Sequence, residues 1–199
     1  MKAAAVHKAE SPSAWPSEWV VRWSHLVKPK GRVLDVACGH GRHATYFYEQ
    51  NHPVALVDRA QAAIESIAIG VHGCEKVVAD IENGPWPFSG RQFDAVVVTN
   101  YLWRPLMPTL LASLEPGGVL IYETFSAGNE TVGKPSRPDF LLRPAELLEV
   151  CKGLRVVAFE EGFVPNGNAG SARFIQRIAA VREDSAVPGS SNPKRYPLD

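Results

Sequence analysis

The segment VLDVACGHGRHATYF holds the first residues whose spacing points to chemistry. It predicts a strand that ends near Val36, then a loop, and a helix that begins directly after the loop. Glycines at a strand-to-helix turn let the backbone approach a ligand with no Cβ in the way. The helix N-terminus adds free N–H donors and a partial positive charge. We therefore expect a nucleotide-like cofactor to be bound by Ala37, Cys38, Gly39 and Gly41.

Two carboxylates flank this loop and limit which cofactor it can hold. Asp35 precedes the loop at the strand end, where a carboxylate repels a pyrophosphate and favours a cationic sulfonium or ammonium group. Asp58 ends the next predicted strand, a position that faces a ribose in doubly wound folds. The run from Gly39 to Ala44 also satisfies the dinucleotide pattern G-x-G-x-x-G/A. A nicotinamide-dependent oxidoreductase therefore remains an alternative, although we expect no second substrate domain.

The elements that position these residues alternate along the chain. Apolar runs predict strands over 32–37, 53–58, 76–80, 93–99 and 119–123. Helical spacing predicts helices over 41–50, 60–71, 104–114 and 143–151, and a short helix within 13–27 has a proline placed for its first turn. Continuous valine, leucine and isoleucine runs are typical of parallel strands buried on both faces. Strand–helix alternation indicates the same α/β architecture.

The last two predicted strands, 154–159 and 173–181, have only a turn-rich stretch between them, which indicates an antiparallel hairpin. We therefore predict a doubly wound, mostly parallel seven-stranded sheet that ends in this hairpin. One domain is expected over 14–183, between a flexible N-terminus (1–13) and a disordered tail (184–199).

Composition excludes several classes of partner. Lysine plus arginine (21) equals aspartate plus glutamate (21), whereas a protein that follows a nucleic-acid backbone carries a basic surplus, so we expect no nucleic-acid partner. No apolar run reaches about 20 residues, so we expect no membrane partner. The three cysteines suit neither a zinc site nor a disulfide framework, and the N-terminus lacks a signal-peptide pattern. These features predict a cytoplasmic protein. We also expect no metal site, because His40 and His43 have no apparent third ligand in the sequence.

From about Arg32 to Val181 the chain resembles the class I S-adenosylmethionine-dependent methyltransferases. LDVACGHG is similar to their acidic, glycine-rich first motif, with Ala37 in place of the first glycine. LVDRA resembles their ribose-binding strand end, which implies cofactor contacts by Asp58 and Arg59.

Three more segments continue the resemblance in order. VVADIENGPWPF is similar to the third motif, which implies that Asp80 meets the adenine amino group and Ile81 packs on its ring. FDAVVVTNYLWRPL resembles the fourth motif, which implies Asn100 and Tyr101 beside the methyl group. LEPGGVLIYETF resembles the turn and fifth strand. Within the family, the stretches from NYLWRPLM to ETF and GNETVGKPSRPDFLLRPAEL most resemble small bacterial tellurite-resistance-like and type 11 methyltransferases.

The resemblance implies transfer of a methyl group from S-adenosylmethionine to a small-molecule acceptor. We expect in-line displacement that relies mainly on positioning, an effect worth roughly 7–11 kcal/mol. A protein that binds S-adenosylmethionine without catalysis is the remaining alternative. Tyr101 and Glu123 are the catalytic candidates. Alternatively, Tyr101 is an aromatic residue that only fills the crevice at the strand end. Glu123 is alternatively a buried carboxylate paired with Arg104 or Arg137.

Other side chains are candidates for the substrate side. Trp15, Trp19 and Trp23 recur every four residues, so Trp15 or Trp19 is either a lid over the cofactor or part of a core stripe. The long connection 126–138 is of a length that is commonly functional. The remaining substrate candidates are Lys134 and Arg137 in this connection, together with Arg104 and Arg173. Lys134, Arg137 and Arg173 are candidates for an anion-binding rim, and the alternative is a solvated, charged loop.

Overall fold

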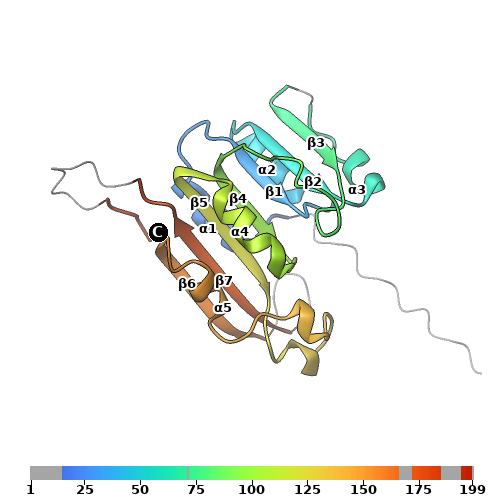
Figure 1. Ribbon diagram of the computed structural model, residues 1–199, viewed down its shortest axis with the longest axis vertical. Helices are drawn as coiled ribbons and strands as arrows, with labels where there is room; N and C mark the ends of the chain where they lie inside the picture. The colour runs from blue at the N-terminus through green and yellow to red at the C-terminus, as the bar shows by residue number, and fades with distance from the viewer. Residues whose placement is uncertain (1–14, 71, 166–171, 185–193, 199) are drawn as a thin grey trace, which may run out of the picture.

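The computed structural model describes residues 15–70, 72–165, 172–184 and 194–198 and contains a seven-stranded sheet in the order β3-β2-β1-β4-β5-β7-β6 (Figure 1). The strands are β1 (Val33–Val36), β2 (Val54–Asp58), β3 (Cys74–Val78), β4 (Phe93–Thr99), β5 (Leu114–Phe125), β6 (Arg155–Val164) and β7 (Arg173–Val181). The first five pair in parallel, and β7 pairs antiparallel with both β5 and β6. The predicted doubly wound sheet with a terminal hairpin is thereby confirmed.

The sheet is buried on both faces in its middle and exposed at its first edge. Every residue of β1 is buried, whereas every residue of β3 is half-buried or exposed. Burial on both faces, which the apolar runs predict, is therefore not found for β3. The reason is topological, because β3 is an edge strand and has a neighbour on one side only.

The helices form two layers, one on each face of the sheet (Figure 1). The first layer is α1 (Glu18–Trp23) with the 3-10 turn η1 (Ser24–Leu26), α2 (Arg42–Glu49) and α3 (Gln61–Glu65). The second is α4 (Met107–Ala112), preceded by the turn η2 (Arg104–Leu106), and α5 (Glu146–Val150). Each layer buries its own apolar cluster, with Phe47 in the first and Leu110 in the second.

Several predicted boundaries are wrong for local reasons. The helix expected over 60–71 ends at Glu65, because the Ser66 hydroxyl donates to the carbonyl of Ala63 and competes with the helical hydrogen bonds. The helix expected to reach Leu114 ends at Ala112, and Leu114 instead begins β5 opposite Phe93.

The N-terminal helix and the last helix also differ from the sequence prediction. Pro16 lies before the first turn of α1, since Ser17 is the N-cap and accepts from the backbone N–H of Trp19. The helix expected over 143–151 is shorter, because α5 covers only Glu146–Val150. Residues 126–138, predicted as a long connection, include the 3-10 turn η3 (Asn129–Thr131), and the turn η4 (Pro138–Phe140) follows.

The two predicted flanking segments lie largely outside the described residues, which exclude 1–14, 185–193 and 199. Residues 194–198 are described and contact the first helical layer. His25 Nε2 lies 3.2 Å from the carbonyl oxygen of Pro197, and Lys194 pairs with Asp184 at 2.7 Å. Among all described helices, none has the length and apolar character needed to span a bilayer.

Candidate functional site

A cleft of about 330 Å³ lies at the carboxyl ends of the parallel strands. Between β1 and β4 the connections change direction, with β2 and β3 on one side and β5 on the other. Ligands bind doubly wound sheets at such a switch point. The cleft is lined by the strand ends and by the loops that follow them: Ala37, Asp58, Arg59, Ala79, Asp80, Ile81, Glu82, Asn100, Tyr101, Leu102, Thr124, Phe125, Pro135 and Phe140.

The glycine loop and the carboxylate at the end of β2 are joined by a hydrogen bond. The backbone N–H of Gly39 donates to Asp58 Oδ2 at 2.8 Å, and that of Ala60 donates to Asp58 Oδ1 at 2.8 Å. Each carboxylate oxygen keeps a lone pair for a further donor. Asp58 is therefore fixed in orientation and can still accept from two ligand hydroxyls.

Three residues of the loop adopt left-handed backbone conformations. The φ angles are +52° at Ala37, +54° at Gly39 and +70° at Gly41. A Cβ at Gly39 would meet no atom within 4 Å, which leaves open space above the loop. A Cβ at Gly41 would lie 2.6 Å from Ile67 Cδ1, so this glycine is needed where α2 packs on the segment after α3.

Asp35 lies within β1 and is 1% exposed, rather than at the open strand end. Its Oδ2 accepts from the backbone N–H of Ala44 at 3.0 Å, so that it caps the first turn of α2. Burial raises the pKa of Asp35 to about 7, although the Ala44 N–H and the Arg42 guanidinium oppose the change. Asp35 does not line the cleft.

The loop after β3 forms one wall of the cleft. Asp80 Oδ1 accepts from the backbone N–H groups of Glu82 and Asn83, and Oδ2 accepts from the Asn83 side chain. These contacts, with the Asn83 side chain first, lower the pKa of Asp80. The exposed loop thus presents an ionised carboxylate beside the partly buried Ile81.

Tyr101 and Asn100 form the wall that follows β4. The Tyr101 hydroxyl is buried without a hydrogen bond to any described residue, and burial, with the nearby Glu82 carboxylate, raises its pKa. Asn100 has a φ of +54° and donates through its backbone to the carbonyl of Glu123. Because the Tyr101 hydroxyl stays protonated at neutral pH, Tyr101 cannot act as a general base.

Glu123, the second catalytic candidate, is buried and has partners other than those expected. Its Oε1 accepts from Ser17 Oγ at 3.0 Å, and its Oε2 pairs with Arg177 at 3.2 Å. The expected pairing with Arg104 or Arg137 is therefore wrong. Arg177 comes from β7, which lies beside β5 in the sheet and sets Glu123 opposite Arg177.

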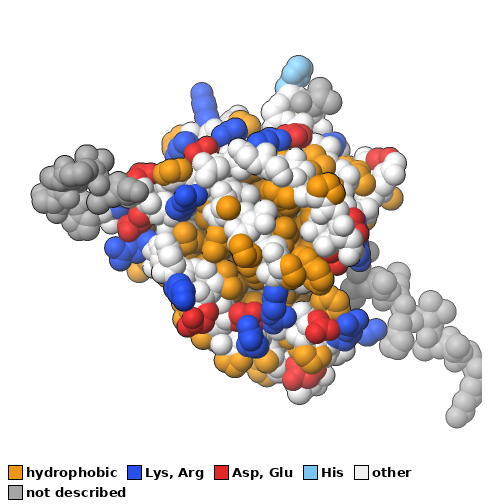
Figure 2. Space-filling view, in the orientation of Figure 1, with side chains coloured by type: hydrophobic (Ala, Val, Ile, Leu, Met, Phe, Trp, Pro, Cys, Tyr) orange, Lys and Arg blue, Asp and Glu red, His pale blue; other side chains and the backbone are white. Residues whose placement is uncertain are grey.

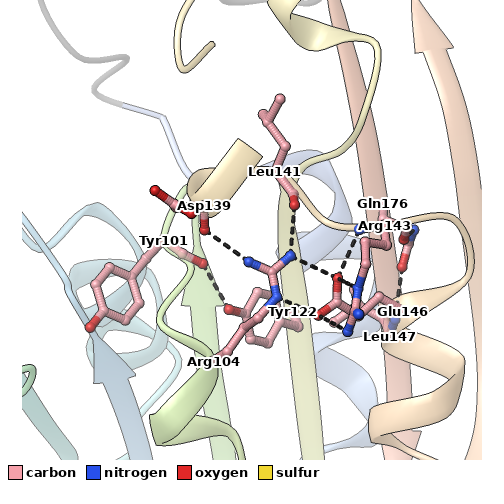
Figure 3. A network of polar contacts seen from close by, with 9 residues as sticks. All are labelled: Tyr101, Arg104, Tyr122, Asp139, Leu141, Arg143, Glu146, Leu147 and Gln176. Atoms are coloured by element: carbon pink, nitrogen blue, oxygen red, sulfur yellow. Dashed lines mark hydrogen bonds and ion pairs between the residues drawn. The ribbon is translucent and has the colours of Figure 1, made fainter. Parts of the chain in front are cut away.

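Arg104 belongs to a network that holds the outer wall of the cleft (Figure 3). Its guanidinium pairs with Glu146 at 2.7 Å and also donates to the carbonyls of Asp139 and Leu141. Phe140 lies between these two carbonyls in the chain and lines the cleft. The expected substrate contact by Arg104 is thus replaced by a structural role.

The two tryptophans proposed as a lid, Trp15 and Trp19, differ in their exposure to solvent. Trp19 is 2% exposed and donates through its indole nitrogen to the carbonyl of Ile178, so it is a core residue and not a lid. Trp15 is 79% exposed, and its carbonyl accepts from Arg42.

None of the three cations expected to form an anion-binding rim, Lys134, Arg137 and Arg173, lines the cleft. Arg137 is exposed and pairs with Asp139, while Pro135, and not Lys134, lines the cleft. Arg173 lies at the start of β7 with its Nε buried.

The two histidines near the loop have separate partners. His40 Nδ1 lies 2.9 Å from Ser66 Oγ. The ring of His43 is buried and its Nε2 accepts from the backbone N–H of Ser17 at 3.1 Å. Burial lowers the pKa of His43 to about 3, so the ring is neutral.

Some cleft residues were identified from the sequence and others were not. The predicted cofactor residues that line the cleft are Ala37, Asp58, Arg59, Asp80, Ile81 and Asn100, whereas Asp35, Cys38, Gly39 and Gly41 are not among its lining residues. Thr124 and Phe125 also line the cleft and were not predicted, although they directly follow Glu123 at the end of the fifth strand. Pro135 and Phe140 were not predicted either, because their apolar side chains carry no chemical signal beside the charged residues of the same loop.

Residues 33–118 match the family model described as "Methyltransferase domain". The resemblance to methyltransferases found in the sequence is thereby confirmed.

Relatives and solved structures agree with this assignment. Over 54% of its length the chain is 32% identical to a phthiotriol/phenolphthiotriol dimycocerosates methyltransferase of Mycobacterium ulcerans, and the match spans 42% of that relative. The structure of TehB from Haemophilus influenzae is similar with a TM-score of 0.66 and 19% identity, over 82% of this chain and 61% of that chain. Coclaurine N-methyltransferase bound to N-methylheliamine and SAH is similar with a TM-score of 0.60 and 12% identity, over 81% and 69%.

Proposed function

We propose that the protein transfers a methyl group from S-adenosylmethionine to a small-molecule acceptor. The observation that carries the proposal is the contact between the Asp58 carboxylate and the Gly39 N–H at the cleft. It supports the proposal because a carboxylate that can accept from hydroxyls lies beside a backbone loop with open space above it. The likeness to a methyltransferase solved with SAH supports the choice of cofactor.

The residues of the cleft fit the parts of this cofactor. Asp58 suits the ribose, and Ile81 and Leu102 supply apolar surface for the adenine. The ionised Asp80 can accept from the adenine amino group. Thr124, Phe125 and the loop residues beyond them close the other end. A cleft of about 330 Å³ is at the small end of the range for ligand sites, and this favours a small acceptor.

We infer that the reaction relies on positioning rather than on a general base. When bound, S-adenosylmethionine would supply an electrophilic methyl group for in-line displacement by the acceptor. Asp58 and Asp80 are held in hydrogen bonds with neighbouring groups, and Tyr101 stays protonated. The walls of the cleft align the acceptor and exclude water, the effect that dominates for well-oriented reactants. A thiolate, amine or soft oxyanion is the acceptor chemistry that suits such a site.

Asp35 also disfavours the nicotinamide alternative. A dinucleotide places its pyrophosphate at the N-terminus of the helix after the glycine loop. Here the Asp35 carboxyl already accepts from the Ala44 N–H in the first turn of α2. A pyrophosphate at the same helix end could not bind the Ala44 N–H, because Asp35 already occupies it. Above pH 7 it would also be repelled by the ionised Asp35 carboxylate.

Calorimetric titration with S-adenosylhomocysteine and, separately, with NAD tests this choice. Micromolar binding of S-adenosylhomocysteine with no heat from NAD supports the proposal, and the reverse result refutes it. Incubation with methyl-labelled S-adenosylmethionine and a panel of thiols, amines and oxyanions then separates an enzyme from a non-catalytic binding protein. With an acceptor in hand, a rate that depends on an enzyme group with a pKa near neutrality would contradict the positioning mechanism.

A further inference from the structure

The cleft has an aromatic wall on the side away from the residues that suit the adenosine. Asp58 and Asp80 lie at and after the ends of β2 and β3, on one side of the switch point between β1 and β4. Tyr101 and Phe125 lie at the ends of β4 and β5, on the other side, and Phe140 comes from the loop after β5. We call these three residues, Tyr101, Phe125 and Phe140, the aromatic wall.

Hydrogen bonds to the backbone hold the loop part of this wall in place. The N–H of Leu142 donates to the carbonyl of Phe125 at 3.0 Å, which sets the segment that carries Phe140 beside the end of β5. The Arg104 guanidinium donates to the two carbonyls on either side of Phe140, at 2.9 and 2.8 Å. The two phenylalanines are therefore fixed relative to each other before a ligand binds.

The tyrosine of the wall is also fixed through its backbone. The buried Tyr122 hydroxyl donates to the carbonyl of Tyr101 at 2.7 Å. Figure 3 shows that the Tyr101 ring points away from the polar network around Arg104 and Glu146. A wall that is formed in advance lowers the entropy cost of binding a ligand against it.

The charged residues that line the cleft make it negative. In the described part of the chain they are three carboxylates and one guanidinium: Asp58, Asp80, Glu82 and Arg59. Arg137 lies 5.1 Å from the centroid of the Phe140 ring, but it pairs with Asp139 and does not line the cleft. S-adenosylmethionine brings one net positive charge, which does not remove the excess of carboxylates. An anionic acceptor would therefore be repelled, whereas a neutral or cationic one would not.

The approach to the aromatic wall also favours an apolar ligand. Phe140 is 38% exposed, so the wall extends from the cleft to the surface. Figure 2 shows apolar side chains gathered over α4 on the second-layer face, with basic and acidic side chains mixed around them. This face, as far as the structure describes it, presents no broad basic surface that would attract an anion.

We propose that the methyl acceptor is an amine on an apolar, aromatic body without an anionic group, bound against the aromatic wall. The inference rests on the proposed function and narrows its acceptor chemistry, because thiolates and oxyanions carry the charge that the cleft repels. Aromatic side chains pack on such a body and attract an ammonium group through their ring faces. The contact of Arg137 with Phe140 is an attraction of this kind within the chain. A neutral amine needs no general base, which favours it over a hydroxyl.

Three small probes test the proposed acceptor class. Calorimetry follows 2-phenylethylamine, n-propylamine and 3-phenylpropanoate as each is titrated into protein saturated with S-adenosylhomocysteine. The second probe lacks the ring, and the third keeps the ring but carries a negative charge. We expect saturable binding of 2-phenylethylamine, at least tenfold tighter than that of either other probe. Equal or tighter binding of n-propylamine or 3-phenylpropanoate, or no saturable binding of 2-phenylethylamine, overturns the proposal.

Variants of the wall test where the amine binds. Phe140→Ala and Phe125→Leu should each weaken 2-phenylethylamine binding at least fivefold. Phe163→Ala is the matched control, because Phe163 is an exposed aromatic residue of β6 that does not line the cleft, and it should bind normally. Unchanged amine affinity in both wall variants overturns the site.

Affinity for S-adenosylhomocysteine separates this inference from the proposed function. It should stay within twofold of the unmodified protein in all three variants, which shows that the fold and the cofactor site are intact. A parallel loss in Phe140→Ala would place Phe140 against the cofactor and overturn the acceptor site. Failure of the amine to bind the S-adenosylhomocysteine complex leaves the proposed function standing, whereas a protein that does not bind S-adenosylhomocysteine refutes both.

Discussion

Asp58 and Gly39, which lie 19 residues apart in the chain, are joined by a hydrogen bond of 2.8 Å from the glycine N–H to the carboxylate. The same carboxylate accepts from Ala60, so both of its oxygens are oriented before a ligand arrives. Such preorganisation lowers the entropy cost of binding. The Asp58 carboxylate and the glycine loop thus form one structural unit at the edge of the cleft.

Asp58→Ala should therefore weaken S-adenosylhomocysteine binding by about 10- to 100-fold, since hydrogen bonds to a charged group contribute roughly 1.5–3 kcal/mol. The affinity of Asp58→Asn should lie between those of the unmodified protein and Asp58→Ala, because its amide oxygen can accept from Gly39 but carries no charge. Calorimetry checks both variants. Asp184→Asn, an exposed carboxylate paired with Lys194, is the control and should bind normally. Equal affinity of Asp58→Ala and the unmodified protein would contradict the assignment.

Ala37 occupies a left-handed conformation, with a φ of +52°, at the position where the family motif has glycine. This conformation costs a non-glycine residue roughly 1–2 kcal/mol, and glycine loses about 0.5–1 kcal/mol more entropy on folding. Ala37→Gly should therefore raise the free energy of unfolding by up to about 1 kcal/mol in urea titrations. Ala62→Gly, in the exposed part of α3, should lower it by a similar amount. A destabilised Ala37→Gly would mean that the loop is unstrained.

The glycine loop, Asp58 and Asp80 were predictable because each follows directly from where a parallel strand ends. Apolar runs fix those ends to within a few residues, and parallel strands bring their carboxyl ends to one edge. The resemblance to family motifs then predicts which part of the cofactor each of these residues contacts. Local sequence was sufficient for this side of the cleft.

The partners of the charged residues were not predictable, because they come from distant parts of the chain. Glu123 pairs with Arg177 through the register of β5 and β7, and Arg104 meets Glu146 through the packing of α5. The helical spacing of Trp19 is equally compatible with a core stripe and a lid. Only the position of α1 against β5 and β7 shows that its indole is buried. Residues that act through tertiary contacts need the fold.

Gly39 and Gly41 should respond differently to alanine in the ligand-free protein. Both have positive φ, so either substitution adds roughly 1 kcal/mol of backbone strain. Only at Gly41 would the new methyl group lie 2.6 Å from Ile67 Cδ1. Gly41→Ala should therefore be destabilised about 1–3 kcal/mol more than Gly39→Ala. Adding Ile67→Val, which removes Cδ1, should recover part of the difference in a double-mutant cycle. Equal destabilisation by the two alanines would contradict this packing.

Asp35 should make stability depend on pH. Its pKa is raised by burial from 3.8 to about 7, so the folded protein binds a proton more tightly than the unfolded chain. The stabilisation is complete below pH 3.8 and is lost as the pH rises to about 7. Asp35→Asn keeps the oxygen that accepts from Ala44 and cannot ionise. The free energy of unfolding of Asp35→Asn, relative to the unmodified protein, should therefore be higher at pH 8 than at pH 5. A pH-independent difference would show that Asp35 ionises normally.

Glu146 should have the opposite pH dependence. Burial alone would raise its pKa, but hydrogen bonds from Arg104 and from the Arg143 backbone and side chain lower it to about 2 (Figure 3). The stabilisation is complete above the ordinary pKa of 4.5 and is lost as the pH falls to about 2. Glu146→Gln should cost roughly 2–4 kcal/mol at pH 7, because it leaves Arg104 without its partner. That cost should shrink between pH 4.5 and pH 2.

The same variant tests whether the network holds the wall of the cleft. Arg104 also donates to the carbonyls on either side of Phe140, so Glu146→Gln should loosen that wall while Asp58 and the glycine loop stay in place. Affinity for S-adenosylhomocysteine should fall less than threefold, and protease cleavage within 133–142 should become faster. Glu183→Gln, which breaks the exposed pair with Arg155, should change neither property. Unchanged proteolysis in Glu146→Gln would show that the loop is held by other contacts.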